Sequence, residues 1–330
     1  MTDAHQWNPR QPPPPFVRPT RIDPRGVTGP TRGQADGPRW RRSSAGLYLP
    51  TSVDPTVSSQ RIVEAAALLP VDGAVTGWAA LHLCGAFFLD GQRYGDLGRI
   101  LLPVPLTVGP GQGRRKREGI RYLEDRVGAV ERVYDIPCTP ALRATFDEMR
   151  LSDDLREAVV AMDMAAAAGL VTLDRMHMFV AGHAGWNGVP LVRQALDLAD
   201  ERSDSPQETR YRLVWELDAG LPRPLVNRPV FDLNGRLLGY PDLLDPVAGL
   251  VGEYDGDDHR RAPRHSGDVT REGRLRDVGL EVTRATGADV RDRARLAQRI
   301  LGARGRARFE PPERRAWTLT PPPGFRPRRR

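Results

Sequence analysis

Hydrophobic and polar positions alternate along the chain in segments of two lengths, which predict helices and strands in mixed order. The longer, helix-periodic segments of the first half predict helices over 60–69, 74–84, 140–149, 154–168, 173–181 and 189–200. The shorter ones predict strands over 99–104, 119–123 and 128–135. Residues 40–50 alternate around Gly46, which predicts the strand pair of a wing, with a small helical unit near 26–34.

A polar stretch over 199–206 separates this half from a second series of elements. Ser205 and Glu208 have capping-box spacing around Pro206, so a helix is expected over 206–219. The turn Asn234-Gly235 between apolar runs predicts a hairpin. The remaining pattern predicts strands over 225–232, 236–244, 250–254 and 280–285, and helices over 269–278 and 289–301. The second half is therefore expected to be an α-β-β-β-α-β-α domain.

Length, composition and charge indicate that the two predicted domains are flanked by basic arms at both ends of the chain. The chain has 330 residues, 39% of them hydrophobic, with 31 Pro and 33 Gly. Residues 1–42 contain eight Arg against three acidic residues, and residues 304–330 contain nine Arg against two Glu. Because the whole chain carries only +7, the body between these ends is acidic. We expect a Pro/Arg-rich arm over 1–38 and a basic tail over 303–330, serving as phosphate contacts or as solvated ends.

Two cysteines are too few for a disulfide framework or a zinc site of the usual spacing. Neither an apolar run of membrane-spanning length nor an apolar leader occurs, so a cytoplasmic protein without a membrane partner is expected.

The strongest candidate chemistry lies between Gly239 and His259. Two strand-length apolar runs, 237–244 and 250–254, flank a Pro- and Gly-containing turn. Asp242 ends the first strand, while Glu253 and Asp255 project from one face of the second because they are two residues apart. Converging carboxylates repel one another unless a cation lies among them, so a divalent ion is expected on Asp242, Glu253 and Asp255.

The other candidates differ in how far a purely structural role explains them. Glu253 lies within an apolar strand, where an unpaired charge costs several kcal/mol, so a metal or a partner is required. Turn chemistry suffices for Asp242, and helix capping suffices for Glu208, which leaves both roles open. His259 follows the carboxylates and has a side chain suited to proton transfer.

Arginines surround the candidate site, and lysine is almost absent from the chain. Arg271 and Arg274 share a helix face and Arg284 lies on the next strand, so they are candidates for offsetting phosphate charge; an exposed helix face explains the first two equally well. Lys116 is the single lysine and lies in the basic turn 111–117, which is typical of a solvated hairpin tip or of a nucleic-acid contact.

The order of Glu208, Pro241-Asp242, Glu253-Tyr-Asp-Gly256 with His259, and Gly279-Leu-Glu-Val-Thr-Arg284 resembles the PD-(D/E)XK nuclease superfamily, in its Vsr-like branch. The resemblance extends over 203–302. It implies a restriction-endonuclease-like fold and hydrolysis of phosphodiester bonds, with Mg²⁺ or Mn²⁺ on Asp242 and Glu253 and a supporting acid at Glu208. The superfamily usually has Lys two residues after the Glu, where this chain has Asp255; in the Vsr-related branch acid or His chemistry takes that place.

Residues 39–200 resemble AbiEi-type antitoxin and regulator proteins, which implies an α+β domain with a degenerate winged helix. The motifs are Trp40-Arg-Arg with Gly46-Leu-Tyr48, residues 75–85, residues 139–147 and residues 157–163. The combined hypothesis is a DNA endonuclease with an N-terminal targeting or regulatory module, and with a cognate toxin or a second copy as further partners. The alternative is a non-catalytic DNA-binding regulator with a vestigial nuclease fold; the same chemistry would also cleave RNA.

Overall fold

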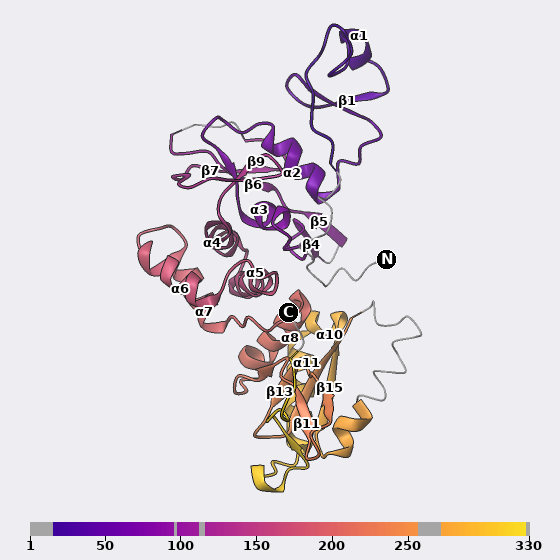
Figure 1. The fold of residues 1–330 in the computed structure, drawn as a ribbon, viewed down its shortest axis with the longest axis vertical. Helices are drawn as coiled ribbons and strands as arrows, with labels where there is room; N and C mark the ends of the chain where they lie inside the picture. The colour runs from indigo at the N-terminus through magenta and orange to yellow at the C-terminus, as the bar shows by residue number, and fades with distance from the viewer. Residues whose placement is uncertain (1–15, 96–97, 112–115, 257–271, 328–330) are drawn as a thin grey trace. The chain divides into compact units, whose positions relative to one another are not determined.

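The computed structural model describes residues 16–95, 98–111, 116–256 and 272–327. It is a mixed α/β structure with several small sheets, and it divides into two compact units, Met1–Leu196 and Asp197–Arg330 (Figure 1). The division lies near the polar stretch where the sequence predicts it.

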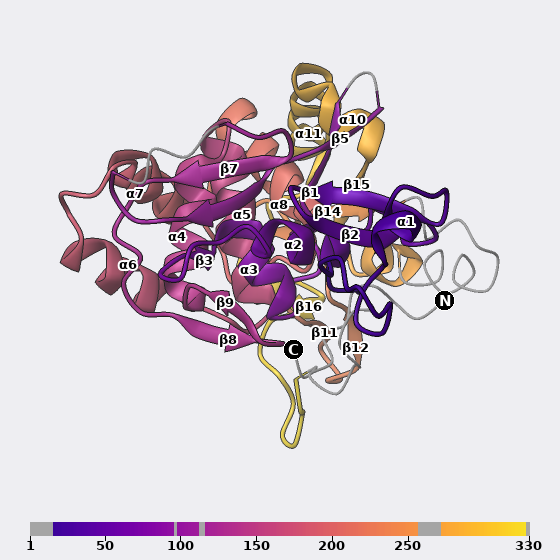
Figure 2. The same ribbon diagram turned by 90° about the horizontal axis from the view of Figure 1, so that it is seen from above.

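The first unit contains a mixed five-stranded sheet in the order β7-β6-β3-β9-β8. The strands β3 and β6 are antiparallel, whereas β3–β9 and β6–β7 are parallel. Their bounds are β3 Ala74–Val75, β6 Val104–Thr107, β7 Ile120–Leu123, β8 Glu131–Val133 and β9 Ile136–Cys138. The helices α2 (Ser58–Ala66) and α3 (Gly77–Leu83) lie against this sheet (Figure 2).

Four further helices follow the sheet close to their predicted positions: α4 Ala141–Leu151, α5 Leu155–Ala167, α6 Leu173–Gly182 and α7 Val189–Leu198. The side chains of Asp154 and Thr172 cap α5 and α6 by accepting a backbone N–H three residues on. The prediction of one helix over 74–84 was wrong at its start, because Ala74–Val75 is a central strand. A short apolar run does not distinguish a buried strand from a helix, and Gly77, at φ +54°, marks the change.

The strand pair predicted over 40–50 is present. The strands β1 (Trp40–Ser44) and β2 (Leu47–Pro50) are antiparallel around Gly46, whose φ is +72°. The predicted helical unit near 26–34 is a single turn, α1 (Arg32–Ala35), with a capping box between Thr31 and Gln34. A second hairpin joins β4 (Gln92–Gly95) to β5 (Gly98–Leu101).

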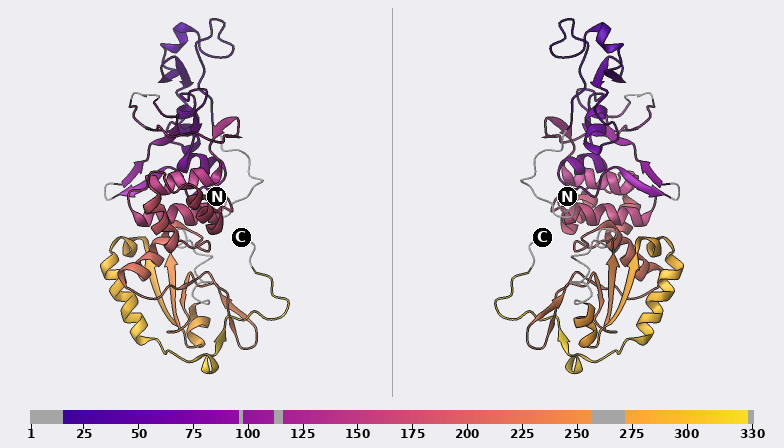
Figure 3. Two further views of the ribbon diagram at one scale, coloured as in Figure 1. Left: turned by 90° about the vertical axis from the view of Figure 1, so that its left-hand side faces the viewer. Right: turned by 90° about the vertical axis from the view of Figure 1, so that its right-hand side faces the viewer.

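The second unit contains a four-stranded sheet in the order β10-β13-β14-β15. The strands are β10 Leu225–Val226, β13 Leu243–Asp245, β14 Leu250–Asp255 and β15 Glu281–Thr286. The hairpin β13–β14 is antiparallel, and β15 is parallel to β14. Its helices include α8 Pro206–Leu213 with a π-helical extension Val214–Asp218, the helical residues 272–277, α10 Gly287–Arg291 and α11 Arg293–Arg306. In Figure 3 the yellow helix α11 runs beside these strands.

Two predicted strands are each divided between two sheets. The segment 225–232 becomes β10 and β11 (Val230–Asp232), and 236–244 becomes β12 (Leu237–Gly239) and β13. The breaks fall at Asn227, which has a φ of +47°, and before Pro241, which has no N–H to donate to a ladder. The hairpin predicted at Asn234-Gly235 joins β11 to β12.

The predicted basic tail contributes to the fold of the second unit. The strand β16 (Trp317–Thr318) pairs with β11, and Trp317 is buried in the core. Phe325 contacts Phe231 with ring centroids 4.8 Å apart. A composition dominated by Pro and Arg hides these few apolar residues, and for that reason the sequence predicts a tail.

Alternate residues of β14 enter different hydrophobic clusters. Leu250 packs with Tyr211, Trp215 and α11 on one face of the sheet. Val251 packs on the other face with Leu275, which lies in the helical residues 272–277, and with Trp317. Glu253 lies two residues after Val251 on the strand, so its side chain projects from the same face of the sheet as that of Val251. None of the helices in the described ranges is both long enough and apolar enough to span a membrane.

Candidate active site

The site is built at the junction of β13 and β14. Leu243 is paired with Gly252, so Asp242, which directly precedes β13, lies at the level of Glu253. The backbone N–H of Tyr254 donates to the Asp242 carboxylate at 2.6 Å. Glu253 is only 5% exposed. The structure therefore places these two predicted residues at the same level of the sheet, with Glu253 on a strand that has neighbours on both sides.

Arg284 lies across the ladder from Glu253, because β15 runs parallel to β14 in that register. Its guanidinium donates to the Asp255 carboxylate at 3.1 Å and contacts the Glu272 carboxylate at 2.5 Å. Asp255 and Arg284 thus form an ion pair on the same side of the sheet. Glu272, which the sequence did not single out, adds an acid from the helical residues 272–277.

Glu208 occupies the first turn of α8, where the capping prediction is half confirmed. The Ser205 hydroxyl accepts the Glu208 N–H at 3.2 Å, as a helix cap does. The Glu208 carboxylate does not accept from the Ser205 N–H as in a capping box; it accepts from the Ser205 hydroxyl at 2.9 Å, and from the Asp204 N–H and the Asn227 side chain, both at 3.0 Å. Burial raises the pKa of Glu208 above its usual value, and these donors oppose the shift.

Asn227 connects Glu208 to Asp242. Its side-chain amide donates to Glu208 and to the Arg202 carbonyl, while its backbone N–H donates to the Asp242 carbonyl at 3.2 Å. The left-handed backbone at φ +47° brings both groups into reach. One signal for this role is visible in the sequence, since Asn is among the few residues that tolerate positive φ.

Tyr211 is a second neighbour that the sequence analysis missed. It is fully buried, and its hydroxyl lies so close to Gly252 that a Cβ there would be 2.7 Å away. Burial, together with the nearby charges of Asp242 and Glu253, raises the pKa of Tyr211. Its phenol therefore stays protonated at neutral pH. A glycine inside an apolar strand was the available signal, because it often marks a close approach of another group.

The remaining predicted residues are only partly described. Arg274 is half-buried, and its helical neighbour Arg276 forms an ion pair with Glu272. His259 and Arg271 lie outside the described residues, as does most of the basic turn 111–117.

Two of the three predicted metal ligands, Asp242 and Glu253, lie at the same level of the sheet. Within residues 16–95, 98–111, 116–256 and 272–327, no group of three or more His, Cys, Asp and Glu side chains is arranged to hold a metal ion. Asp255 contacts Arg284 instead. Asp242 and Glu253 supply the hard oxygen donors that Mg²⁺ prefers, and proteins often hold this ion through one or two carboxylates, with waters and substrate phosphates completing its shell.

The chain is similar to two proteins of Mycobacterium tuberculosis, the uncharacterized protein Rv2248 of strain H37Rv and the uncharacterized protein MT2308 of strain CDC 1551. It is 29% identical to each over 204 residues, which are 61% of this chain and 73% of each relative. No protein-family model and no solved structure matches the chain.

Proposed function

We propose that the unit Asp197–Arg330 is a metal-dependent endonuclease that hydrolyses phosphodiester bonds in DNA, with a fold of the Vsr-like, restriction-endonuclease-like type. The observation that carries the proposal is the buried carboxylate of Glu253, which lies at the same level of the sheet as Asp242. A buried acid on a strand with neighbours on both sides is costly to the fold. A cation bound at this site would offset the cost of burying the carboxylate.

The topology of the second unit supports the proposal. An antiparallel hairpin, β13–β14, places Asp242 and Glu253, and the parallel strand β15 places Arg284 beside them. Helix α8 precedes the sheet and α11 follows it, in the order that the resemblance implies.

Each residue then has a role in the proposed chemistry. Asp242 and Glu253 would hold Mg²⁺ or Mn²⁺, which polarises a phosphate and lowers the pKa of a bound water. Glu208 accepts a hydrogen bond from Asn227, which in turn bonds to Asp242, and so stabilises the start of β13. Arg284, held by Asp255 and Glu272, offsets charge on the phosphate, with Arg271 and Arg274 as further candidates. His259 would transfer a proton.

The first unit has a composition suited to DNA targeting. Residues 16–50 contain seven Arg against two Asp, and Arg21, Arg25, Arg32 and Arg39 lie on the segment that leads into the β1–β2 hairpin. Such a surface binds phosphates in a salt-dependent way. An antitoxin-like role, with a toxin or a second copy as partner, belongs to the same proposal.

The test is cleavage of plasmid DNA and of oligonucleotides with Mg²⁺ and Mn²⁺, comparing wild type with Glu253→Gln and Asp242→Asn. The control is Glu313→Gln, which removes an exposed carboxylate from the same unit. We expect metal-dependent nicking by wild type and by the control, and its loss in both site variants. RNA of the same sequence, run in parallel, identifies the substrate.

One observation favours the alternative of a non-catalytic DNA-binding regulator. Asp255 stands where the superfamily usually has Lys, and it forms an ion pair with Arg284. A protein that binds DNA in a salt-sensitive way but cleaves neither DNA nor RNA, with Glu253→Gln indistinguishable from wild type, would establish that alternative.

A further inference from the structure

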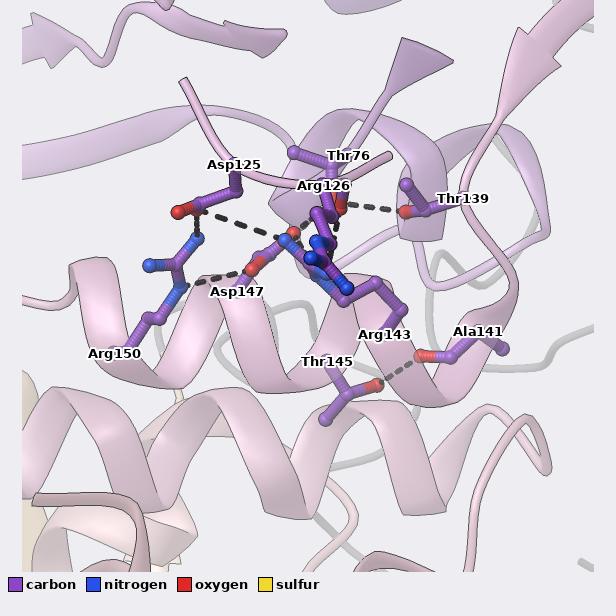
Figure 4. Close-up of polar contacts among 9 residues, drawn as sticks. All are labelled: Thr76, Asp125, Arg126, Thr139, Ala141, Arg143, Thr145, Asp147 and Arg150. Carbon is purple, nitrogen blue, oxygen red and sulfur yellow. Dashed lines mark hydrogen bonds and ion pairs between the residues drawn. The ribbon is translucent and has the colours of Figure 1, made fainter. Parts of the chain in front are cut away.

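Two arginines of α4, Arg143 and Arg150, both contact the Asp125 carboxylate in the first unit (Figure 4). Arg143, Asp147 and Arg150 are separated by four and three residues, so they lie on one face of the helix. The Arg143 and Arg150 side chains are only 7% and 8% exposed. Guanidinium groups this buried must be matched by anions and acceptors.

Asp147 holds both guanidinium groups in fixed orientations. It is fully buried, and its two carboxylate oxygens accept the Nε–H of Arg143 at 2.9 Å and of Arg150 at 2.8 Å. The Thr76 hydroxyl donates to the same carboxylate at 2.6 Å, and Thr139 donates to Thr76. The planar guanidinium groups therefore turn their terminal nitrogens in a direction that Asp147 determines.

One terminal nitrogen of each guanidinium group faces Asp125, while Arg143 Nη1 donates to the Arg126 carbonyl at 3.2 Å. The Asp125 carboxylate contacts Arg150 Nη2 and lies 3.6 Å from Arg143 Nη2. Asp125 is 39% exposed and lies in the segment that connects β7 to β8. Two Arg and two Asp cancel in charge, so removal of Asp125 leaves one positive charge without a counterion. The arginine pair needs an anion at this point, and its present anion is a side chain that solvent can reach.

Aromatic rings lie beside Arg143. The Arg143 guanidinium carbon is 4.3 Å from the centre of the Trp186 ring, and the His183 ring lies 4.2 Å from that of Trp186. Both rings are half-buried, so part of each reaches solvent. Aromatic rings next to a cationic group are the arrangement that proteins use to stack a nucleobase beside its phosphate.

We propose that Arg143 and Arg150 form a binding site for the phosphate of a nucleoside phosphate, which Asp125 fills in the absence of ligand. Two oriented guanidinium groups recognise phosphate through charge-assisted hydrogen bonds, as they recognise the Asp125 carboxylate. Trp186 and His183 contact the base. All these residues belong to Met1–Leu196, so the site does not depend on the proposed nuclease centre.

The test measures binding to the full-length chain with a chelator present, which keeps the proposed nuclease centre inactive. The probes are inorganic phosphate, adenosine monophosphate and a short single-stranded oligonucleotide. Asp125→Asn removes the competing carboxylate, and Asp72→Asn removes an exposed one elsewhere in the unit. We expect Asp125→Asn to bind the phosphate probes about ten-fold more tightly than wild type or the control, since one cationic charge becomes available.

Two further variants separate the parts of the site. Arg150→Gln should abolish the gain in the Asp125→Asn background, whereas Arg175→Gln, an exposed control, should not. Trp186→Leu should weaken binding of the nucleotide probes and leave inorganic phosphate unchanged; the tighter of the two nucleotide probes identifies the free nucleotide or the strand as the natural source. Equal binding by folded Asp125→Asn, Asp72→Asn and wild type overturns the proposal. If Asp125→Asn does not fold, Arg150→Gln in the wild-type chain decides, because unchanged phosphate binding there also overturns it.

Discussion

The Tyr211 hydroxyl and the backbone of Gly252 are in direct contact, such that a Cβ at residue 252 would lie 2.7 Å from the hydroxyl oxygen and about as close to the ring carbons. The pair joins helix α8 to the strand that carries Glu253. Tyr211 therefore leaves no room for a side chain at residue 252. The strand pattern alone does not explain why this residue is glycine.

Gly252→Ala should destabilise the protein by roughly 1–3 kcal/mol, because a new methyl group meets a packed ring. Tyr211→Phe removes the hydroxyl, so the two substitutions should be non-additive by about 0.5 kcal/mol or more in a double-mutant cycle. The measurement is urea unfolding of all four proteins. Gly302→Ala on α11, where a Cβ meets only the end of an arginine at 3.8 Å, is the matched control and should stabilise slightly. Additive effects at 211 and 252 would contradict the contact.

Trp317 should contribute to stability like a core residue although it lies in the Pro/Arg-rich end of the chain. Trp317→Ala should cost about 3–5 kcal/mol in free energy of unfolding, since the side chain is 5% exposed and β16 is paired with β11. Val247→Ala, at a residue that is 63% exposed, should change it by less than about 0.5 kcal/mol. Similar small effects of both would show that the segment is a free tail.

His82, which is buried, and Glu148, which is half-buried, should have opposite effects on stability as the pH changes. Burial raises the pKa of Glu148 to about 7 from 4.5, and burial lowers the pKa of His82 to about 4 from 6.5. The stability that Glu148 contributes is full below pH 4.5 and is lost as pH rises to 7, because ionisation is harder in the folded state. The contribution of His82 is full above pH 6.5 and is lost as pH falls to 4.

Glu148→Gln keeps the acceptor for the Trp78 N–H and removes the titration. We expect its unfolding free energy to rise more steeply than that of wild type between pH 4.5 and 6.5, and to exceed that of wild type at pH 8. Glu118→Gln, at an exposed position, is the control and should follow wild type. A Glu148→Gln curve parallel to wild type throughout would refute the shifted pKa of Glu148.

Both the backbone conformation of Asn227 and its side-chain amide should contribute to the free energy of unfolding. Asn227→Ala loses the bonds to Glu208 and to the Arg202 carbonyl, and at φ +47° it lacks the short polar side chain that lets Asn adopt left-handed backbone, so a loss of roughly 2–3 kcal/mol is expected. Asn227→Gly relieves the backbone term and should cost about 1 kcal/mol less. Denaturant unfolding of the two variants separates the terms; equal losses would assign the whole effect to the hydrogen bonds.

Much of the candidate site was predictable from local signals. The apolar run around Glu253 indicated a buried strand with a charge in it, and the Asn234-Gly235 turn indicated the hairpin between β11 and β12. The helix start at Ser205 followed from capping chemistry, which acts within one turn of the chain. In each case the cause and its effect lie a few residues apart.

Only the tertiary structure decided which distant groups meet. The pairing of Arg284 with Asp255 depends on the parallel register of β14 and β15, and the bond from Asn227 to Glu208 depends on a left-handed residue. The burial of Trp317 and the convergence of Arg143 and Arg150 on Asp125 likewise bring together segments far apart in sequence. The chain's own pattern determined most of its helices, the hairpin at Asn234-Gly235 and the strand that carries Glu253. Packing determined the partners of each charge, because a single sequence carries no record of contacts between segments that lie far apart along it.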